Sequence, residues 1–170
     1  MDSGNGSQKS VVYDTCSQAT MNSITLTFES PLSVSPQAAW SWATSVAGIT
    51  AELRPLLRMT MPPGISNIFE VDVRLGRPLF RSWVLLLGVL PIDRSDLTLI
   101  ELDVGHRFLE ESPMFSMKLW RHERTIEPRE NGCTLTDRLE FQPRVAVAVT
   151  RWFIATVFTH RHAVIRRKLG

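Results

Sequence analysis

A chain of 170 residues with 44% hydrophobic and 21% charged residues has the size and composition of one globular domain that buries its own core. The formal net charge is only +2, which excludes a global basic field of the kind that attracts nucleic acid. Cys16 and Cys133 are too few for a disulfide framework, and no apolar run typical of a signal peptide opens the chain. Both features predict a cytoplasmic protein.

The first elements are a tail and a strand. Residues 1–22 are rich in Ser, Gln, Asn and Gly, which predicts a flexible tail, and we expect residues 23–170 to form a single domain. Ile24, Leu26 and Phe28 alternate with polar residues, the period of two that is typical of a half-buried strand.

Two short helices and a strand are expected next. Ser35 followed by Pro36 is typical of a helix N-cap and first helical position. A second short helix is predicted around Ile49–Leu53. The segment 56–61 reads as a strand that two prolines terminate, and residues 63–75 are predicted to be mostly loop.

The segment 78–90 is a continuous apolar run, so periodicity does not separate a buried helix from a buried strand. Pro78 near its start, Gly88 and Pro91 near its end, and its length favour a helix near a cavity entrance. It is too short to cross a bilayer, which takes roughly 20 apolar residues. The helix either packs on the domain or, because its apolar residues exceed one packing stripe, forms a lid with transient membrane contact through Leu79–Leu90.

Strands dominate the next part of the chain, and one long helix ends it. The segment 96–112 is read as a strand with one face formed by Ile100, Leu102, Val104, His106 and Phe108. A hairpin over 119–141 follows. The segment 145–169 has helical spacing, with Val145, Val149, Trp152, Phe153, Thr156, Val157, His160 and Val164 on the expected inner face. This order predicts an α+β fold in which a curved antiparallel sheet wraps around the last helix.

The hairpin places ionisable residues on its apolar face. Asp137 shares the face of Leu139, and His122 and Arg124 share the face of Trp120. The two strand registers that keep this face buried set either His122 or Arg124 opposite Asp137. Because a buried carboxylate needs a cationic partner, we expect Asp137 to be ionised and paired with one of them.

His106 and His160 are also predicted on the inner surface, on the preceding strand and the last helix. They either are satisfied core residues that fix the strand register or line a cavity between sheet and helix. No metal-ligand spacing, glycine-rich phosphate loop or nucleophile elbow is present, so we predict no metal and no cofactor. His160 and His162, two apart on a helix, point in different directions.

The segments "SPMFSMKLWRHERTIEP", "NGCTLTDRLEFQPR" and "FTHRHAVIRRKLG" resemble the helix-grip superfamily of START, pollen-allergen and polyketide-cyclase proteins (SRPBCC). The matching positions are Trp120, His122, Arg124, Gly132, Cys133, Asp137, Phe158 and Arg161. Over residues 24–170 the resemblance implies a seven-stranded antiparallel sheet, two short helices after the first strand, and an elongated apolar cavity against the C-terminal helix.

This resemblance implies a binding protein for a hydrophobic or aromatic small molecule such as a lipid, quinone or polyketide-like compound. The predicted ligand-binding residues are His106, Trp120, His122, Arg124, Asp137, Leu139, Trp152, Thr156 and His160. The alternative is a polyketide cyclase or dehydratase in the same cavity. There His122 would be the general base, Asp137 would orient it, and Arg124 would stabilise an enolate. The sequence leaves open whether the protein is an enzyme.

Overall fold

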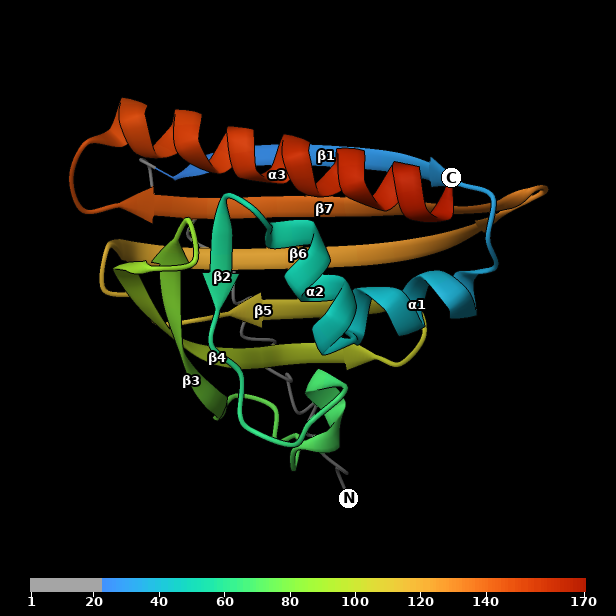
Figure 1. Cartoon of the computed structure of the whole chain (residues 1–170), viewed down its shortest axis with the longest axis horizontal. Coiled ribbons are helices and arrows are strands. Elements are labelled where there is room, and N and C mark those ends of the chain that lie inside the picture. The colour runs from blue at the N-terminus through green and yellow to red at the C-terminus, as the bar shows by residue number, and fades with distance from the viewer. Residues whose placement is uncertain (1–22) are drawn as a thin grey trace, which may run out of the picture.

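Seven antiparallel strands form one curved sheet, and the long C-terminal helix lies along it (Figure 1). The computed structural model describes residues 23–170, so the tail predicted for residues 1–22, with Cys16, lies outside the described residues. The elements in chain order are β1 (Ile24–Leu32), α1 (Pro36–Thr44), α2 (Val46–Leu53), β2 (Leu57–Met59), η1 (Ile68–Glu70), β3 (Pro78–Leu86), β4 (Leu90–Asp103), β5 (Arg107–Glu111), β6 (Met117–Arg129), β7 (Gly132–Pro143) and α3 (Val147–Leu169).

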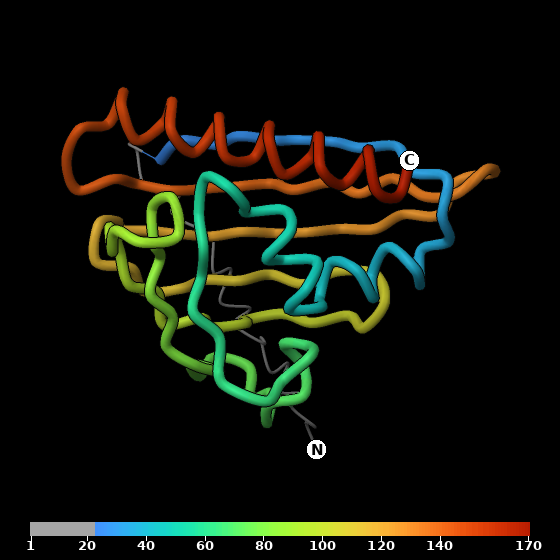
Figure 2. The backbone as a smooth tube through the Cα atoms, viewed as in Figure 1, coloured from blue at the N-terminus to red at the C-terminus, as the bar shows by residue number. Residues whose placement is uncertain are grey.

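The strand order is β1-β7-β6-β5-β4-β3-β2, so the first strand pairs with the last one (Figure 2). Helix α3 contacts β1 and β7, while α1 contacts β6 and β7, and α2 contacts α3. All three helices therefore cover one face of the sheet. The predicted α+β helix-grip architecture is confirmed.

The predicted elements near the N-terminus are confirmed with small shifts. The side chain of Ser35 accepts a hydrogen bond from the backbone N–H of Ala38, and Pro36 opens α1. Helix α2 begins three residues before the predicted Ile49, because Ser45 caps it by accepting from the N–H of Gly48.

The helix predicted for residues 78–90 is wrong, because this segment is strand β3 and the turn that follows it. Strands β2 and β4 pair with its two edges, and Val84 faces inward while Trp83 faces outward. Leu87 and Gly88 turn the chain with φ of 51° and 77°. Part of this segment stays on the surface of the protein. Its apolar residues therefore outnumber those that pack on the buried face of the sheet.

The single strand predicted over 96–112 is also wrong in part. Residues 104–106 form a turn between β4 and β5, with Gly105 at a φ of 93°, a value that favours glycine. His106 is therefore exposed in a turn and does not lie on the inner face. Because the turn has three residues, the alternation of inward and outward side chains has the same phase in β4 and β5. The sequence pattern therefore gave no sign that the chain reverses its direction here.

Helix α3 is confirmed, but its inner face differs from the predicted one. The buried residues are Ile154, Val157, Phe158, Arg161, His162, Val164 and Ile165. Trp152 and Thr156 are exposed, and His160 lies at the edge of the helix, where its Nε2 is 2.6 Å from the backbone oxygen of Arg54. The predicted inner face was wrong at the start of α3, because the apolar residues there are exposed. Within residues 23–170, no helix is long and apolar enough to cross a membrane.

Candidate functional site

The pairing of β6 with β7 decides which residues meet inside the sheet. Arg124 lies opposite Asp137, and His122 lies opposite Leu139, which is the second of the two predicted registers. His122, Arg124 and Asp137 are all buried, with Asp137 0% exposed. The chain thus places two potential cations and a carboxylate together on the helix-covered face.

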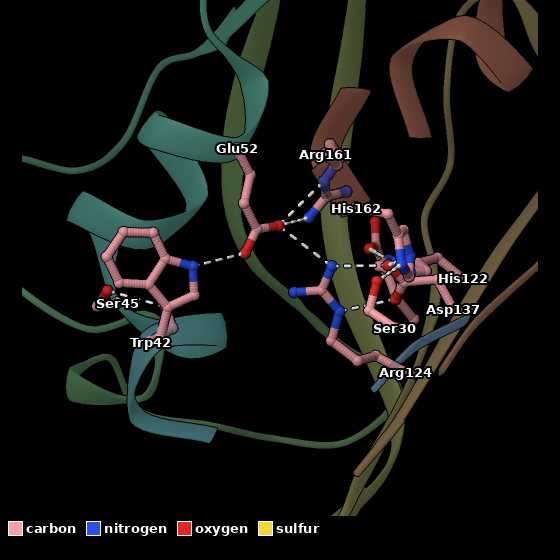
Figure 3. A network of polar contacts seen from close by, with 10 residues as sticks. Ser30, Trp42, Ser45, Glu52, His122, Arg124, Asp137, Arg161 and His162 are labelled. Atoms are coloured by element: carbon pink, nitrogen blue, oxygen red, sulfur yellow. Dashed lines mark hydrogen bonds and ion pairs between the residues drawn. The ribbon is translucent and has the colours of Figure 1, made fainter. Parts of the chain in front are cut away.

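Asp137 is the centre of a buried ion cluster (Figure 3). Arg124 donates from Nε to Oδ1 and from Nη2 to Oδ2, each over 2.7 Å. His122 Nε2 lies 2.8 Å from Oδ1, and His162 Nε2, from α3, lies 3.0 Å from Oδ2. The predicted pairing of Asp137 is therefore present, with His122 and Arg124 both engaged.

A second carboxylate, Glu52 of α2, approaches the cluster from the helical layer (Figure 3). Its Oε2 accepts from Arg124 Nη2 at 3.2 Å and from Arg161 Nη2 at 2.8 Å. Its Oε1 accepts from the indole N–H of Trp42 at 3.0 Å. Glu52 is 0% exposed and links α1, α2, α3 and the sheet through one carboxylate.

His162 is held on both ring nitrogens. Arg166 donates to the hydroxyl oxygen of Ser30 over 2.9 Å, and that hydroxyl lies 2.8 Å from Nδ1 of His162. Because Ser30 accepts from Arg166, its own proton is available for Nδ1. This series of hydrogen bonds, from Arg166 to Ser30 and from Ser30 to His162, fits the neutral tautomer in which His162 donates from Nε2 to Asp137.

His122 stands between two carboxylates. Its Nε2 faces Asp137, and its Nδ1 lies 3.5 Å from Oε2 of Glu110. Burial alone would lower the pKa of His122, but the Asp137 carboxylate outweighs burial and raises it. Two carboxylate neighbours suit an imidazolium, which donates from both nitrogens and has no lone pair for a general base.

The cluster balances its own charge. Burial by itself would raise the pKa of Asp137, but Arg124 and His122 hold it well below its usual range. Burial likewise opposes ionisation of Glu52, whose pKa is nevertheless lowered by Arg124 and Arg161. The three carboxylates Asp137, Glu52 and Glu110 therefore face three cations, Arg124, Arg161 and His122. Such compensation makes buried charges tolerable.

A pocket of about 340 Å³ lies between the sheet and helices α2 and α3, and it reaches the ion cluster. Most of its wall is apolar, including Leu53, Leu57, Ile68, Val84, Leu97, Leu99, Phe108, Met114, Met117, Trp120, Phe153, Ile154, Val157 and Phe158. Its charged lining residues are Asp93, Glu110, His122, Arg124 and Arg161. The pocket is thus a mostly apolar chamber. Glu110, His122, Arg124 and Arg161 form a polar wall at the ion cluster, whereas Asp93 lies apart from them and accepts hydrogen bonds from Phe115 and Ser116.

The pocket includes only part of the predicted ligand-binding set. Trp120, His122 and Arg124 line it. Asp137 and Leu139 are buried beside it and do not line it. His106, Trp152, Thr156 and His160 do not line it. His106 is exposed, so its predicted inner-face position is wrong, whereas His160 is half-buried at the edge of the covered face of α3.

Sequence reasoning did not predict Glu52, Glu110 or His162 at the site. Arg161 and His162 do follow the buried Val157 and Phe158 by one helical turn each, a spacing that could have identified the inner face. Glu52 carries no such signal, because a glutamate in a short helix is usually solvated.

Cys133 is a buried free thiol. Burial raises the pKa of the Cys133 thiol, which keeps it in the less nucleophilic protonated form. Within residues 23–170, no group of three or more His, Cys, Asp or Glu side chains is arranged to hold a metal ion.

The profile of a protein family described as a domain of unknown function, DUF8410, matches residues 30–169, most of the chain. The chain belongs to this family. No curated protein matches its sequence.

Solved structures share the fold of this DUF8410 chain. Protein CV1439 from Chromobacterium violaceum has 14% identity and a TM-score of 0.61, with 84% of this chain and 97% of that one covered. The AHSA1 protein from Silicibacter pomeroyi has 12% identity and a TM-score of 0.61, with coverage of 85% and 96%. A START superfamily protein from Mycobacterium smegmatis has 8% identity and a TM-score of 0.55, with coverage of 86% and 96%. The fold is START-like, as the sequence resemblance implied.

Proposed function

We propose that the protein binds a hydrophobic or aromatic small molecule, such as a lipid, quinone or polyketide-like compound, in the pocket beside α3. The observation that carries this proposal is a chamber of about 340 Å³ whose wall is mostly apolar and which meets four charged side chains, Glu110, His122, Arg124 and Arg161, at the ion cluster. Removing apolar surface from water would supply most of the affinity, at roughly 25 cal/mol per Å².

The geometry of His122 favours binding over the cyclase or dehydratase alternative. A general base needs an accessible lone pair, whereas both nitrogens of His122 face carboxylates, and its pKa is raised. Asp137, with four hydrogen bonds from His122, Arg124 and His162, is held in place by its partners rather than directed at a substrate.

Native mass spectrometry of the purified full chain tests the proposal. We expect an added mass from a co-purifying apolar molecule, which organic extraction removes and which returns on incubation with the extract. A chain that carries no such mass and takes none from a lipid and aromatic-compound extract would contradict it.

Val149 both lines the pocket and is exposed, so we place the pocket mouth near the start of α3 and call the exposed apolar residues at this end of the molecule the mouth rim. They are Leu87, Val89 and Leu90 after β3, Phe115 between β5 and β6, and Val147, Val149 and Trp152 at the start of α3. These three segments lie at the same end of the molecule (Figure 1). Met114 and Val149 both line the pocket, which ties the rim to its opening.

Arginines border the mouth rim. Arg58 pairs with Leu85 across β2 and β3, the backbone oxygen of Arg94 accepts from the N–H of Phe115, and Arg144 donates to the backbone oxygen of Phe115. All three are exposed, and among the described residues none forms an ion pair. Exposed aliphatic and aromatic side chains beside free arginines suit an anionic bilayer surface.

We therefore propose transient contact of the mouth rim with an anionic membrane, from which an apolar ligand could enter the pocket without crossing water. This includes the end of the Leu79–Leu90 segment, now as a hairpin tip instead of a helical lid. The cytoplasmic location predicted from the sequence would place the rim against the inner leaflet.

Co-sedimentation with vesicles of phosphatidylcholine and phosphatidylglycerol tests this contact. We expect binding that weakens with salt and is lost in the double variant Val89→Asp, Phe115→Asp. Val104→Asp is the matched control, since Val104 is 70% exposed in the β4–β5 turn, away from the rim. An equal loss of vesicle binding in the control would contradict the proposal. A wild-type dimer that the rim substitutions dissociate would also contradict it, because the rim would then be a contact between two copies of the chain.

A further inference from the structure

Arg124 uses only part of its donor capacity inside the protein. Its Nε and Nη2 donate to Asp137, and Nη2 also donates to Glu52. Its Nη1 is fully buried and has no acceptor among the described residues. Figure 3 shows Nη1 pointing away from Asp137, with no partner drawn. A buried donor of a charged group rarely stays unpaired, because it gave up its hydrogen bonds to water.

The surroundings of Arg124 indicate where an acceptor could come from. Arg124 is 1% exposed and lines the pocket together with Ala43, Leu99 and Phe108, whose side chains are apolar. The carboxylates of Glu52 and Asp137 are already engaged by the other nitrogens of the guanidinium. An acceptor for Nη1 that faces the pocket would therefore belong to water or to a bound molecule that replaces this water.

The charge balance of the cluster restricts the chemistry of that acceptor. The three cations Arg124, Arg161 and His122 are matched by three carboxylates. An added anion would leave an uncompensated negative charge in a buried site, beside Asp137 and Glu52. A neutral oxygen accepts the N–H without disturbing this balance.

We infer that the ligand carries a neutral carbonyl oxygen that accepts a hydrogen bond from Arg124 Nη1, as a ketone, quinone or ester does. This inference rests on the proposed binding function and makes Arg124 the residue that determines specificity for the polar end. His122 and Asp137, which were predicted to orient the ligand, act through Arg124 by fixing its position.

Three ligands of one skeleton test the inference: 2-ethylnaphthalene, 2-acetylnaphthalene and 2-naphthoate. Their affinities for the full chain are measured by displacement of the neutral fluorophore N-phenyl-1-naphthylamine. We expect the ketone to bind at least as tightly as the hydrocarbon and at least tenfold more tightly than the carboxylate. Without a donor, burying the carbonyl should make the ketone more than about tenfold weaker than the hydrocarbon.

The outcomes separate the two proposals. If the hydrocarbon binds and the ketone is tenfold weaker, the carbonyl assignment is overturned while apolar binding stands. Preferred binding of the carboxylate also overturns it. If none of the three ligands displaces the fluorophore and the fluorophore itself does not bind, the proposed function fails.

Two variants locate the carbonyl. Arg124→Lys should weaken binding of the ketone relative to the hydrocarbon, provided that circular dichroism shows a folded chain. The hydroxyl oxygen of Ser95 is the other buried polar side-chain atom without a hydrogen-bond partner in residues 23–170, and Ser95 also lines the pocket. Ser95→Ala should leave the affinity of the ketone relative to the hydrocarbon unchanged. A weaker relative affinity in this variant would place the carbonyl at Ser95 and overturn the assignment to Arg124.

Discussion

Arg124 holds Asp137 through two parallel hydrogen bonds, from Nε to Oδ1 and from Nη2 to Oδ2, each 2.7 Å long. This bidentate geometry matches the planar guanidinium to the planar carboxylate inside the sheet. Because both groups are buried, each one compensates the charge of the other in place of water. Removing either partner should therefore lower the stability of the fold strongly.

Replacing Asp137 by Asn should destabilise the fold strongly. The change leaves the guanidinium of Arg124 and the imidazolium of His122 buried with too little negative charge. We expect a loss of about 3–5 kcal/mol in the free energy of unfolding, measured by urea denaturation. Glu123→Gln is the control: it breaks a surface pair with Arg107 at 2.6 Å and should cost under about 1 kcal/mol. Equal losses in the two variants would contradict the compensated cluster.

The stability of the protein should have a maximum between about pH 5 and pH 6.5. The lowered pKa values of Asp137 and Glu52 mean that their contribution is present above their unfolded pKa, about 4, and is lost as the pH falls through the folded-state values. The raised pKa of His122 means that its contribution is complete below about 6.5 and is lost as the pH rises through the folded-state value.

Urea unfolding from pH 3 to 9 measures this profile. His122→Gln should remove the decline on the alkaline side and leave the acid side in place. His106→Gln, at an exposed turn position, should keep both. A wild-type stability that rises steadily from pH 6 to 9 would contradict the imidazolium assignment.

Blocking the pocket mouth should remove ligand binding without unfolding the protein. Val149 is exposed at the start of α3 and lines the pocket, so Val149→Trp places an indole in the opening. We expect at least a tenfold loss of affinity for N-phenyl-1-naphthylamine and a change in unfolding free energy within about 0.5 kcal/mol. Val147→Trp, two residues earlier, also exposed and outside the pocket, should bind normally.

Gly132 should tolerate no side chain. It opens β7 with a φ of 113°, and a Cβ there would lie 2.0 Å from the backbone oxygen of Leu32. Gly132→Ala should therefore destabilise the fold by more than about 2 kcal/mol. Gly105 has a φ of 93° but no atom within 4 Å of an added Cβ, so Gly105→Ala isolates the backbone strain, about 1 kcal/mol. Similar losses of unfolding free energy in both variants would show that the backbone moves away from the contact with Leu32 without a cost in free energy, which would contradict this prediction.

Local patterns in the sequence were sufficient for several elements. The alternation in 24–28 predicted β1, the Ser35–Pro36 signal predicted the start of α1, and the spacing in 145–169 predicted α3. The hairpin of β6 and β7 was also predictable, because only registers that bury Trp120 and Leu139 together are stable. These features depend on neighbours close in sequence, whose preferences act before any tertiary contact forms.

Other features were decided by contacts between distant residues. The apolar run at 78–90 became β3 because β2 and β4 offer backbone partners on both its edges, which a local pattern does not contain. Glu52 and His162 belong to the site only because α2 and α3 pack over the same face of the sheet. A buried charge takes its partners from wherever the fold brings them. The sequence by itself predicted that Asp137 needs a cation. The tertiary structure decided which cations surround Asp137 and which donor of Arg124 has no acceptor among residues 23–170.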